Sequence, residues 1–353
     1  MSWATKLYIV KRKIPKDKRY DKSLSLEDIR EHLEIRSYGE SYENYIRPGI
    51  LYFTEDLDAL ARELSVDKIV PKGLYIMGIY GGEEKRGEEE YAGLVLLEHS
   101  RDSMVFKFKL HNTRSTLVVP VNSLTRYGVE VYKMIYVGEI NPFRITRYLD
   151  IVLSRYGSEF LRNFLREALK LNERNISAED RRKIEKLIDE LQQPGTITTL
   201  NMNKYYVAYR RVRAFTASIF KPIADNFIIK DEVGYVECRD ESKAYYYAAI
   251  LNYLAFKVVE VGRSFARTQY ARPLLALYIA GLSWNSVDDE VRREIVELSR
   301  RLHEKAPSEE YSNQTVALKD IAQLSEFKEL VKTLDSKVNR ESLEYALSIV
   351  SEL

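Results

Sequence analysis

Short runs rich in β-branched and aromatic residues recur in the first 140 positions, and this composition is typical of strands. One such run is Lys6–Ile14, and five more lie within residues 73–138, separated by glycine, asparagine or charged clusters. Pro120 falls inside one of these runs, which predicts that the run is an edge strand or is broken there. Two segments instead have apolar positions three and four apart, so we expect helices at Ser25–Ile35 and Thr54–Leu64.

The middle of the chain has the spacing of helices. Apolar residues recur three and four positions apart in Phe143–Leu171. The segment Ser177–Gln193 opens with a serine and acidic residues, as helix starts commonly do, and Pro194–Thr196 follows it. We therefore predict a helical connector over residues 143–195.

The second half begins with four strand-like runs between Lys204 and Asp240. The segment Glu241–Gly262 is apolar nearly all round, which predicts a buried helix with Ser242 as its cap and Gly262 at its end. Three helical segments follow within residues 285–353. The prediction is an α+β fold in four parts: a β-rich mixed N-terminal domain (1–142), the helical connector (143–195), β-structure packed on the central buried helix (196–284) and C-terminal helices (285–353).

Composition narrows the class of protein. At 353 residues the chain is long for one core, and its many Lys, Arg and Glu residues with a single cysteine fit a thermophilic protein. The lone Cys238 excludes a disulfide framework and a cysteine metal site, which favours an intracellular, cytoplasmic location. The first residues lack the apolar core of a signal peptide, and no run of 18 apolar residues predicts a membrane span.

Charge is unevenly distributed along the chain. Residues 201–280 contain 12 Lys/Arg and 7 Asp/Glu, a net charge of +5, whereas residues 285–353 contain 10 and 15, a net of −5. Such segregation is expected where one surface meets an acidic polymer. It is equally typical of a thermophilic surface whose basic and acidic parts form salt bridges with each other.

Motifs for catalysis are missing from the sequence. The four histidines are scattered, and neither a phosphate-binding loop nor a nucleophile elbow occurs. The glycine-rich Gly78–Gly87 is typical of a hairpin turn, and Asn141–Phe143 has one proline where the methyltransferase tetrapeptide has two. We therefore expect no metal, no cofactor and no catalytic residue, and binding is favoured over catalysis.

Arginine and tyrosine cluster in the region of net positive charge. If a strand continues through residues 205–215, alternation places Tyr209, Arg211 and Arg213 on one face. Arginine in such a position binds phosphates or reads guanine, and glutamine reads adenine. A second cluster lies within Gly262–Leu282. The residues predicted to contact DNA are Tyr209, Arg210, Arg211, Arg213, Lys221, Arg263, Arg267, Gln269, Tyr270 and Arg272.

The order of these features resembles the target recognition region of adenine-specific DNA methyltransferases and of fused type II restriction–methylation enzymes. The matching stretches are Ala244–Tyr247, Ile250–Asn252, Arg263–Arg267 and Leu298–His303, within about residues 205–307. The resemblance implies a domain that reads double-stranded DNA through a central helix packed on β-structure. The catalytic motifs of those enzymes are absent, so a separate methyltransferase or nuclease chain is the implied catalytic partner.

Three hypotheses follow. The first is a non-catalytic target-recognition protein of a restriction–modification or related defence system, with double-stranded DNA as partner and no membrane contact. The second is a metal-dependent nuclease whose site lies unrecognised in residues 73–138. The third is a scaffold protein that binds no nucleic acid. The sequence leaves open the DNA site, the catalytic partner, the oligomeric state and the role of residues 1–142.

Overall fold

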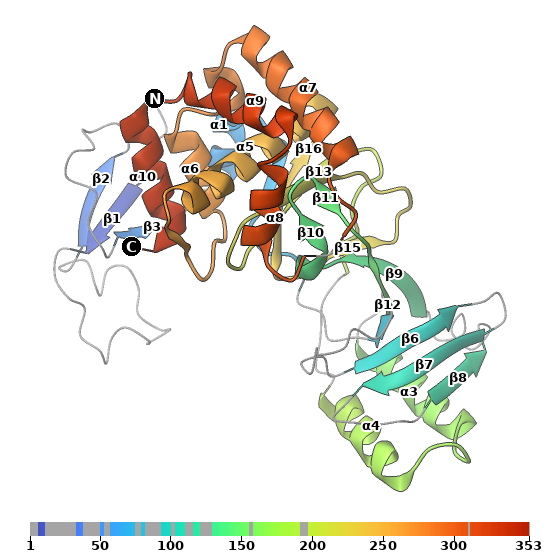
Figure 1. Ribbon diagram of the computed structural model, residues 1–353. Helices are drawn as coiled ribbons and strands as arrows, with labels where there is room; N and C mark the ends of the chain where they lie inside the picture. Colours follow the sequence, from blue (N-terminus) through green and yellow to red (C-terminus); the bar gives the residue numbers. More distant parts are fainter. Residues whose placement is uncertain are drawn as a thin grey trace.

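The fold combines helices and strands, which confirms the predicted α+β class. The computed structural model describes residues 6–10, 33–37, 50–52, 57–74, 79–81, 93–99, 103–109, 116–120, 129–154, 158–190, 197–309 and 311–352. Figure 1 shows a helix-rich body, which contains α5–α10, and a lobe that projects from it and carries α3 and α4.

The body is built on an antiparallel four-stranded sheet of order β14-β13-β16-β4. Its strands are β4 (Lys68–Val70), β13 (Tyr205–Arg210), β14 (Ala217–Phe220) and β16 (Val233–Cys238). The helix α5 (Glu241–Glu260) packs against β13, β14 and β16. This is the predicted arrangement of β-structure on a central helix.

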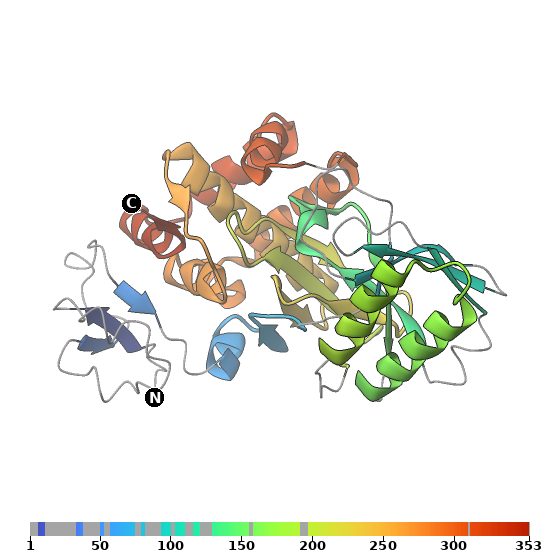
Figure 2. The ribbon, with the colours of Figure 1, turned by 90° about the horizontal axis from the view of Figure 1, so that it is seen from below.

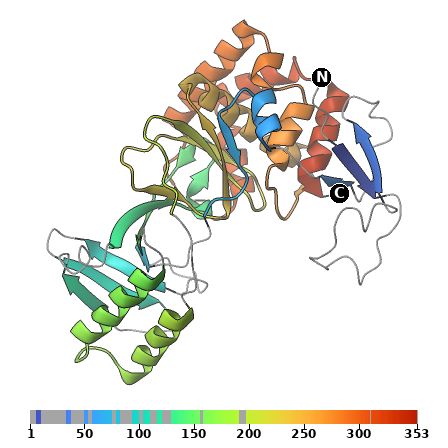
Figure 3. The same cartoon turned by 180° about the vertical axis from the view of Figure 1, so that it is seen from behind.

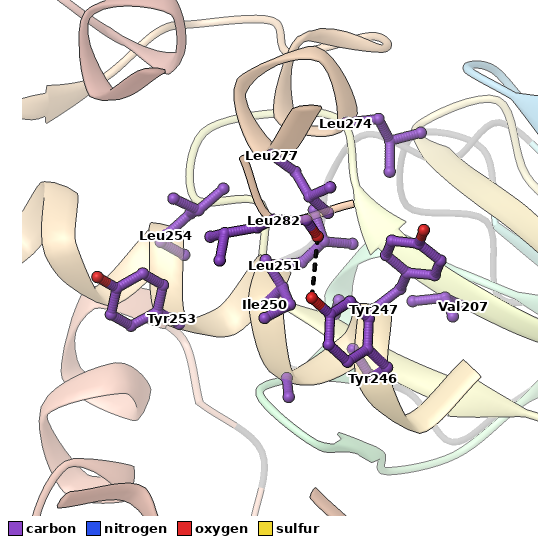
Figure 4. Packing of buried hydrophobic residues seen from close by; sticks show 14 of the residues in the cluster. Val207, Tyr246, Tyr247, Ile250, Leu251, Tyr253, Leu254, Leu274, Leu277 and Leu282 are labelled. Atoms are coloured by element: carbon purple, nitrogen blue, oxygen red, sulfur yellow. Dashed lines mark hydrogen bonds between the residues drawn. The ribbon is translucent and has the colours of Figure 1, made fainter. Parts of the chain in front are cut away.

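The helix α5 is the centre of the core, as its apolar sequence predicts. Residues from Tyr246 to Ala255 are all buried, and Figure 4 shows several of them packed against side chains of α6. The Tyr246 hydroxyl donates to the Leu282 carbonyl at 3.1 Å. The helix ends before Gly262, whose φ of 70° is the left-handed conformation that glycine adopts readily.

Five helices follow α5 in sequence and surround it (Figure 1). They are α6 (Arg272–Ile279), α7 (Asp289–Lys305), α8 (Gln314–Ile321), α9 (Ser325–Asp335) and α10 (Arg340–Val350). The C-terminal region is helical as expected, but the second of the three predicted segments is divided into α8 and α9. The short α1 (Leu57–Glu63) lies at another side of α5, where the Tyr247 hydroxyl donates to the Leu64 carbonyl.

The lobe is organised around a seven-stranded sheet of order β15-β9-β12-β5-β6-β7-β8. Pro120 is the last residue of β8, at the edge of this sheet, as predicted. The strands are β5 (Ile79–Gly81), β6 (Gly93–His99), β7 (Ser103–Lys109), β8 (Thr116–Pro120), β9 (Val129–Ile135), β12 (Leu149–Ser154) and β15 (Phe227–Ile229). The helices α3 (Ser158–Leu171) and α4 (Ala178–Glu190) pack together beside it.

Sheet pairing crosses all three predicted domain boundaries, and at 284/285 residues 264–265 pair with residues 351–352. The strand β15 belongs to the segment 196–284, yet it pairs in parallel with β9 from the N-terminal segment. The strand β12 belongs to the predicted connector and pairs with β9 and β5. The boundaries at 142/143 and 195/196 therefore do not separate independent sheets.

Smaller pairings complete the architecture. A three-stranded sheet of β1 (Lys6–Val10), β2 (Leu33–Ser37) and β3 (Ile50–Tyr52) lies near α10, far from the lobe, as Figures 1 and 2 show. Two-stranded pairings join β10 (Ile140–Asn141) to β11 (Arg144–Ile145) and β17 (Ser264–Phe265) to β18 (Ser351–Glu352). The 3-10 helices η3 (Val137–Glu139) and η4 (Trp284–Ser286) lie in connections.

Several local predictions are wrong. The first half of the predicted connector forms β11 and β12 instead of a helix, because its residues pair across a sheet. Residues Leu33–Ile35 are in β2, so the helix expected at 25–35 does not reach Ile35, and its earlier part lies outside the described residues. The strands β5 and β6 are parallel, which rules out a simple hairpin between them. Asp240, not Ser242, caps α5, since its carboxylate accepts from the Ser242 amide at 2.8 Å.

Within the described segments, none of the helices combines the length and apolar character that crossing a membrane would need.

Candidate nucleic-acid interface

Two segments that are far apart in sequence form one surface, and we call residues 211–216 and 263–272 the basic loops. The main-chain amide of Gln269 donates to the Arg211 carbonyl at 2.7 Å, and the main-chain amide of Arg213 donates to the Arg267 carbonyl at 3.2 Å. An antiparallel bridge joins Val212 to Thr268 between these bonds. The two predicted clusters of arginine are thus adjacent in space.

The outward side of the basic loops carries several guanidinium groups. Arg213 and Arg267 are exposed, and Arg263 and Arg272 are half-buried. Among the described residues, no carboxylate lies within salt-bridge distance of Arg213, Arg263 or Arg272. The salt bridges between the basic and acidic parts of the chain involve other residues, such as Lys257 with Asp335 at 3.2 Å. These three arginines are therefore not used in salt bridges to the acidic helices.

Arg211 and Tyr270 form a fixed pair at the contact between the loops. The Arg211 guanidinium carbon lies 4.6 Å from the centre of the Tyr270 ring, within the range of a cation–π interaction. Arg211 Nε also donates to the Asp231 carbonyl at 2.9 Å. Arg211 is nearly buried, at 9% exposure, whereas Tyr270 is 49% exposed. The pair presents an aromatic ring to solvent with a cation behind it.

The predicted strand alternation does not extend to Arg213. The strand β13 ends at Arg210, and Arg213 has a φ of 61°, so its side chain follows a turn and not a pleat. Tyr209 is fully buried, and its hydroxyl donates to the Tyr270 carbonyl at 2.8 Å. Burial raises the pKa of the Tyr209 phenol well above its usual value. In this structure the Tyr209 side chain holds the backbone of Tyr270 from the protein interior and is not exposed at the surface.

Gln269 is likewise buried, although the sequence predicted it as a reader of bases. Its side chain has no exposed area, and its Nε2 donates to the carbonyls of Ala266 at 2.7 Å and Val350 at 3.1 Å, with a longer contact to the Arg213 carbonyl at 3.4 Å. These bonds tie both basic loops to the end of α10. In this conformation the side-chain amide is buried and cannot reach a base edge.

Arg210 and Lys221 lie away from the exposed surface of the basic loops. Arg210 is half-buried at the end of β13, where burial, together with nearby Arg213, lowers its pKa to about 10. It remains charged at neutral pH. Lys221 is at the opposite end of β14, where its ammonium group donates to the Tyr205 hydroxyl at 3.1 Å. Lys221 is therefore not part of this site.

Two buried arginine donors have unmet hydrogen-bonding capacity, and one of them, that of Arg263, belongs to the basic loops. Within the part of the chain that the structure describes, Arg210 Nε and Arg263 Nη1 are buried without a hydrogen-bond partner. Cationic donors that are desolvated and unpaired favour an anionic acceptor. No group of three or more His, Cys, Asp or Glu side chains that could hold a metal occurs among the described residues.

Two residues from the matching stretches prove to have structural contacts. The Asn252 side chain binds both main-chain groups of Ala217: Oδ1 accepts from the amide at 2.9 Å and Nδ2 donates to the carbonyl at 2.8 Å. His303 Nε2 accepts from the Ile219 amide at 3.3 Å, and its Nδ1 contacts the Ser299 carbonyl at 2.7 Å. Burial lowers the pKa of His303 to about 4, so the ring is neutral. Both side chains therefore bind β14 to the helices that carry them, α5 and α7.

No local sequence pattern indicates how the basic loops are held in place. Arg213 and Tyr270 both have positive φ, at 61° and 45°, which is uncommon for residues other than glycine. The pairing of β17 with β18 and the bond from the Ala266 amide to the Val350 carbonyl, at 3.0 Å, also depend on the C-terminal helix. A glycine would have signalled a left-handed turn at these positions, but arginine and tyrosine do not.

The chain was compared with known proteins. No protein-family model matches it, and no curated protein has a significantly similar sequence.

Proposed function

We propose that this chain is a DNA-binding protein that recognises its target through the basic loops, as a non-catalytic part of a restriction–modification or related defence system. The observation that carries the proposal is the direct backbone pairing of two arginine-bearing loops, through the Gln269–Arg211 and Arg213–Arg267 bonds. Neither loop alone concentrates so much positive charge. Guanidinium groups such as those of Arg213, Arg263 and Arg272, which have no carboxylate within salt-bridge distance among the described residues, suit a phosphate backbone.

The buried donor of Arg263 supports the same proposal. Arg263 has a buried Nη1 without a partner among the described residues, and phosphate oxygens are strong acceptors for guanidinium groups. The role in a defence system rests on the resemblance to target recognition regions, and so does a separate methyltransferase or nuclease chain as catalytic partner. Within the described residues, no observation favours the nuclease or the scaffold hypothesis over DNA binding.

The test is a fluorescence-anisotropy titration of the full chain with a mixed-sequence duplex at several salt concentrations. Each phosphate neutralised contributes a slope of about −0.9 to log K against log salt. We expect Arg213→Ala and Arg267→Ala each to weaken binding and to reduce that slope by about 1.

Arg301→Ala is the matched control, because Arg301 is also exposed but lies on α7 and pairs with Glu297 at 3.1 Å. It should leave both affinity and slope unchanged. Absence of duplex binding at low salt, or equal effects of all three substitutions, would contradict the proposal. A change confined to Arg301→Ala would move the site to α7.

A further inference from the structure

Tyr270 is exposed although aromatic residues of its size are usually covered. It has 49% exposure in the middle of the basic loops, while its neighbours Gln269 and Ala271 are buried. Its position next to several arginines leaves an apolar ring within a polar, cationic surface. An isolated exposed hydrophobic residue needs no explanation in general, but this one is also held in place.

The backbone and the ring of Tyr270 are both fixed. Its φ of 45° lies in the left-handed region, and the buried Tyr209 hydroxyl holds its carbonyl at 2.8 Å. The Arg211 guanidinium covers the ring at 4.6 Å and is itself bound to the Asp231 carbonyl at 2.9 Å. Strained positions that the surroundings enforce are frequent at binding sites. The ring is thus pre-organised, and its outer part is free to contact a ligand.

The chemistry that fits this arrangement is a flat aromatic group beside a phosphate. Aromatic side chains in a basic groove bind single-stranded nucleic acids by stacking on the bases, and this contact tolerates every base. In a continuous duplex both faces of each base are covered by neighbouring pairs. Stacking of a base on the Tyr270 ring therefore requires a base that has left the stack of the duplex.

We propose that Tyr270, backed by Arg211, is a stacking site for an unpaired nucleobase of DNA, with Arg213 and Arg267 beside it to contact the adjacent phosphates. This inference rests on the proposed DNA-binding function, because it uses the same loops. It adds recognition of an unpaired base to the proposed phosphate contacts, because phosphate contacts alone would bind paired and unpaired strands in similar ways.

The test compares three labelled DNAs with the same sequence: a continuous duplex, the duplex with one bulged base, and the single strand. The wild-type chain should prefer the two DNAs with unpaired bases. Tyr270→Phe keeps the ring and should keep the preference. Tyr270→Asn removes the ring with a residue that tolerates positive φ, and it should weaken binding to the bulged duplex roughly 5- to 150-fold while leaving continuous-duplex binding and its salt slope unchanged.

A direct readout is 2-aminopurine placed at the bulge. Stacking on Tyr270 should quench its fluorescence in the wild-type and Tyr270→Phe complexes but not with Tyr270→Asn. Unfolding curves of the two variants verify that they are folded. If Tyr270→Asn does not fold, the comparison of the three DNAs and the 2-aminopurine signal with the wild-type chain still test the stacking site.

The outcomes separate this inference from the proposed function. If the wild-type chain binds all three DNAs equally and Tyr270→Asn changes nothing, the stacking site is refuted while DNA binding stands. If no DNA binds, the proposed function itself fails. Tighter binding of the matching bulged RNA, or full competition by a free nucleotide at the DNA's own concentration, would overturn the assignment to DNA.

Discussion

Substitution of the Asn252 side chain tests quantitatively how α5 holds β14, the strand that follows the basic loop 211–216. Asn252 is completely buried in α5, and its side chain makes two hydrogen bonds to Ala217, the first residue of β14. Ala217 lies one residue beyond the basic loop 211–216, so this contact fixes the point where the loop enters the sheet. We predict that Asn252→Ala destabilises the fold strongly.

The magnitude follows from which groups are left without partners. Each lost bond contributes about 0.5–1.5 kcal/mol, and the orphaned Ala217 N–H costs about 1–3 kcal/mol. The Ala217 carbonyl keeps a donor, because the Phe143 amide reaches it at 2.9 Å. We therefore expect a loss of about 2–4 kcal/mol in the free energy of unfolding.

Urea denaturation followed by circular dichroism measures this loss at pH 7, with Asn203→Ala at an exposed loop position as the matched control. Asn252→Asp gives an independent check, because a protonated carboxyl can donate to the Ala217 carbonyl as the amide does, whereas a buried carboxylate cannot. Burial raises the pKa of that aspartate in the folded state, so its deficit should grow as pH rises above about 3.9. A loss under about 1 kcal/mol for Asn252→Ala would refute the reasoning.

Two more predictions concern buried side chains near the same strand and loops. The folded-state pKa of His303 is about 4, below its ordinary 6.5, so its contribution to stability is complete above pH 6.5 and is lost as pH falls toward 4, by up to about 3 kcal/mol. Urea midpoints at pH 4, 5 and 7 should show this slope in the wild type and a flatter one in His303→Gln; parallel profiles would contradict it. Gln269→Leu removes the donors to Ala266 and Val350 but no charge, so it should weaken binding to every DNA sequence with an unchanged salt slope. A change of sequence preference in that anisotropy titration would instead make Gln269 a reader of bases.

Local sequence signals predicted the centre of the body well. The helix α5 is unambiguous because its apolar residues are contiguous and Gly262 ends it. The segment before α3 was misassigned because Ile145, Leu149 and Val152 fit a helical spacing, while Leu149, Ile151 and Leu153 fit a strand equally well. Only pairing with β9 decides between them.

The candidate site depends on contacts that no local pattern reveals. The sequence correctly singled out the two arginine clusters by composition, but it could not separate their exposed members from the buried ones. Gln269 is buried because its hydrogen-bond partners include Val350, which is 81 positions away. The turn at Arg213 depends on its bond to Arg267 across 54 positions (267 − 213). Such partners are fixed by tertiary structure, and residue type alone gave the opposite interpretation for Gln269.

The contacts of Asn252 and His303 show that part of the resemblance to target recognition regions concerns the fold and not DNA binding. Asn252 and His303 both bind main-chain groups of β14, so a similar fold would need these residue types whatever it bound. The exposed Arg213 and Tyr270 stand outside those stretches, in loops whose shape is set by long-range bonds. If the chain recognises a DNA sequence, its specificity must then reside in the loops and not in the scaffold. Substitutions in the exposed part of the basic loops should consequently alter binding without lowering stability, the reverse of what is expected for Asn252.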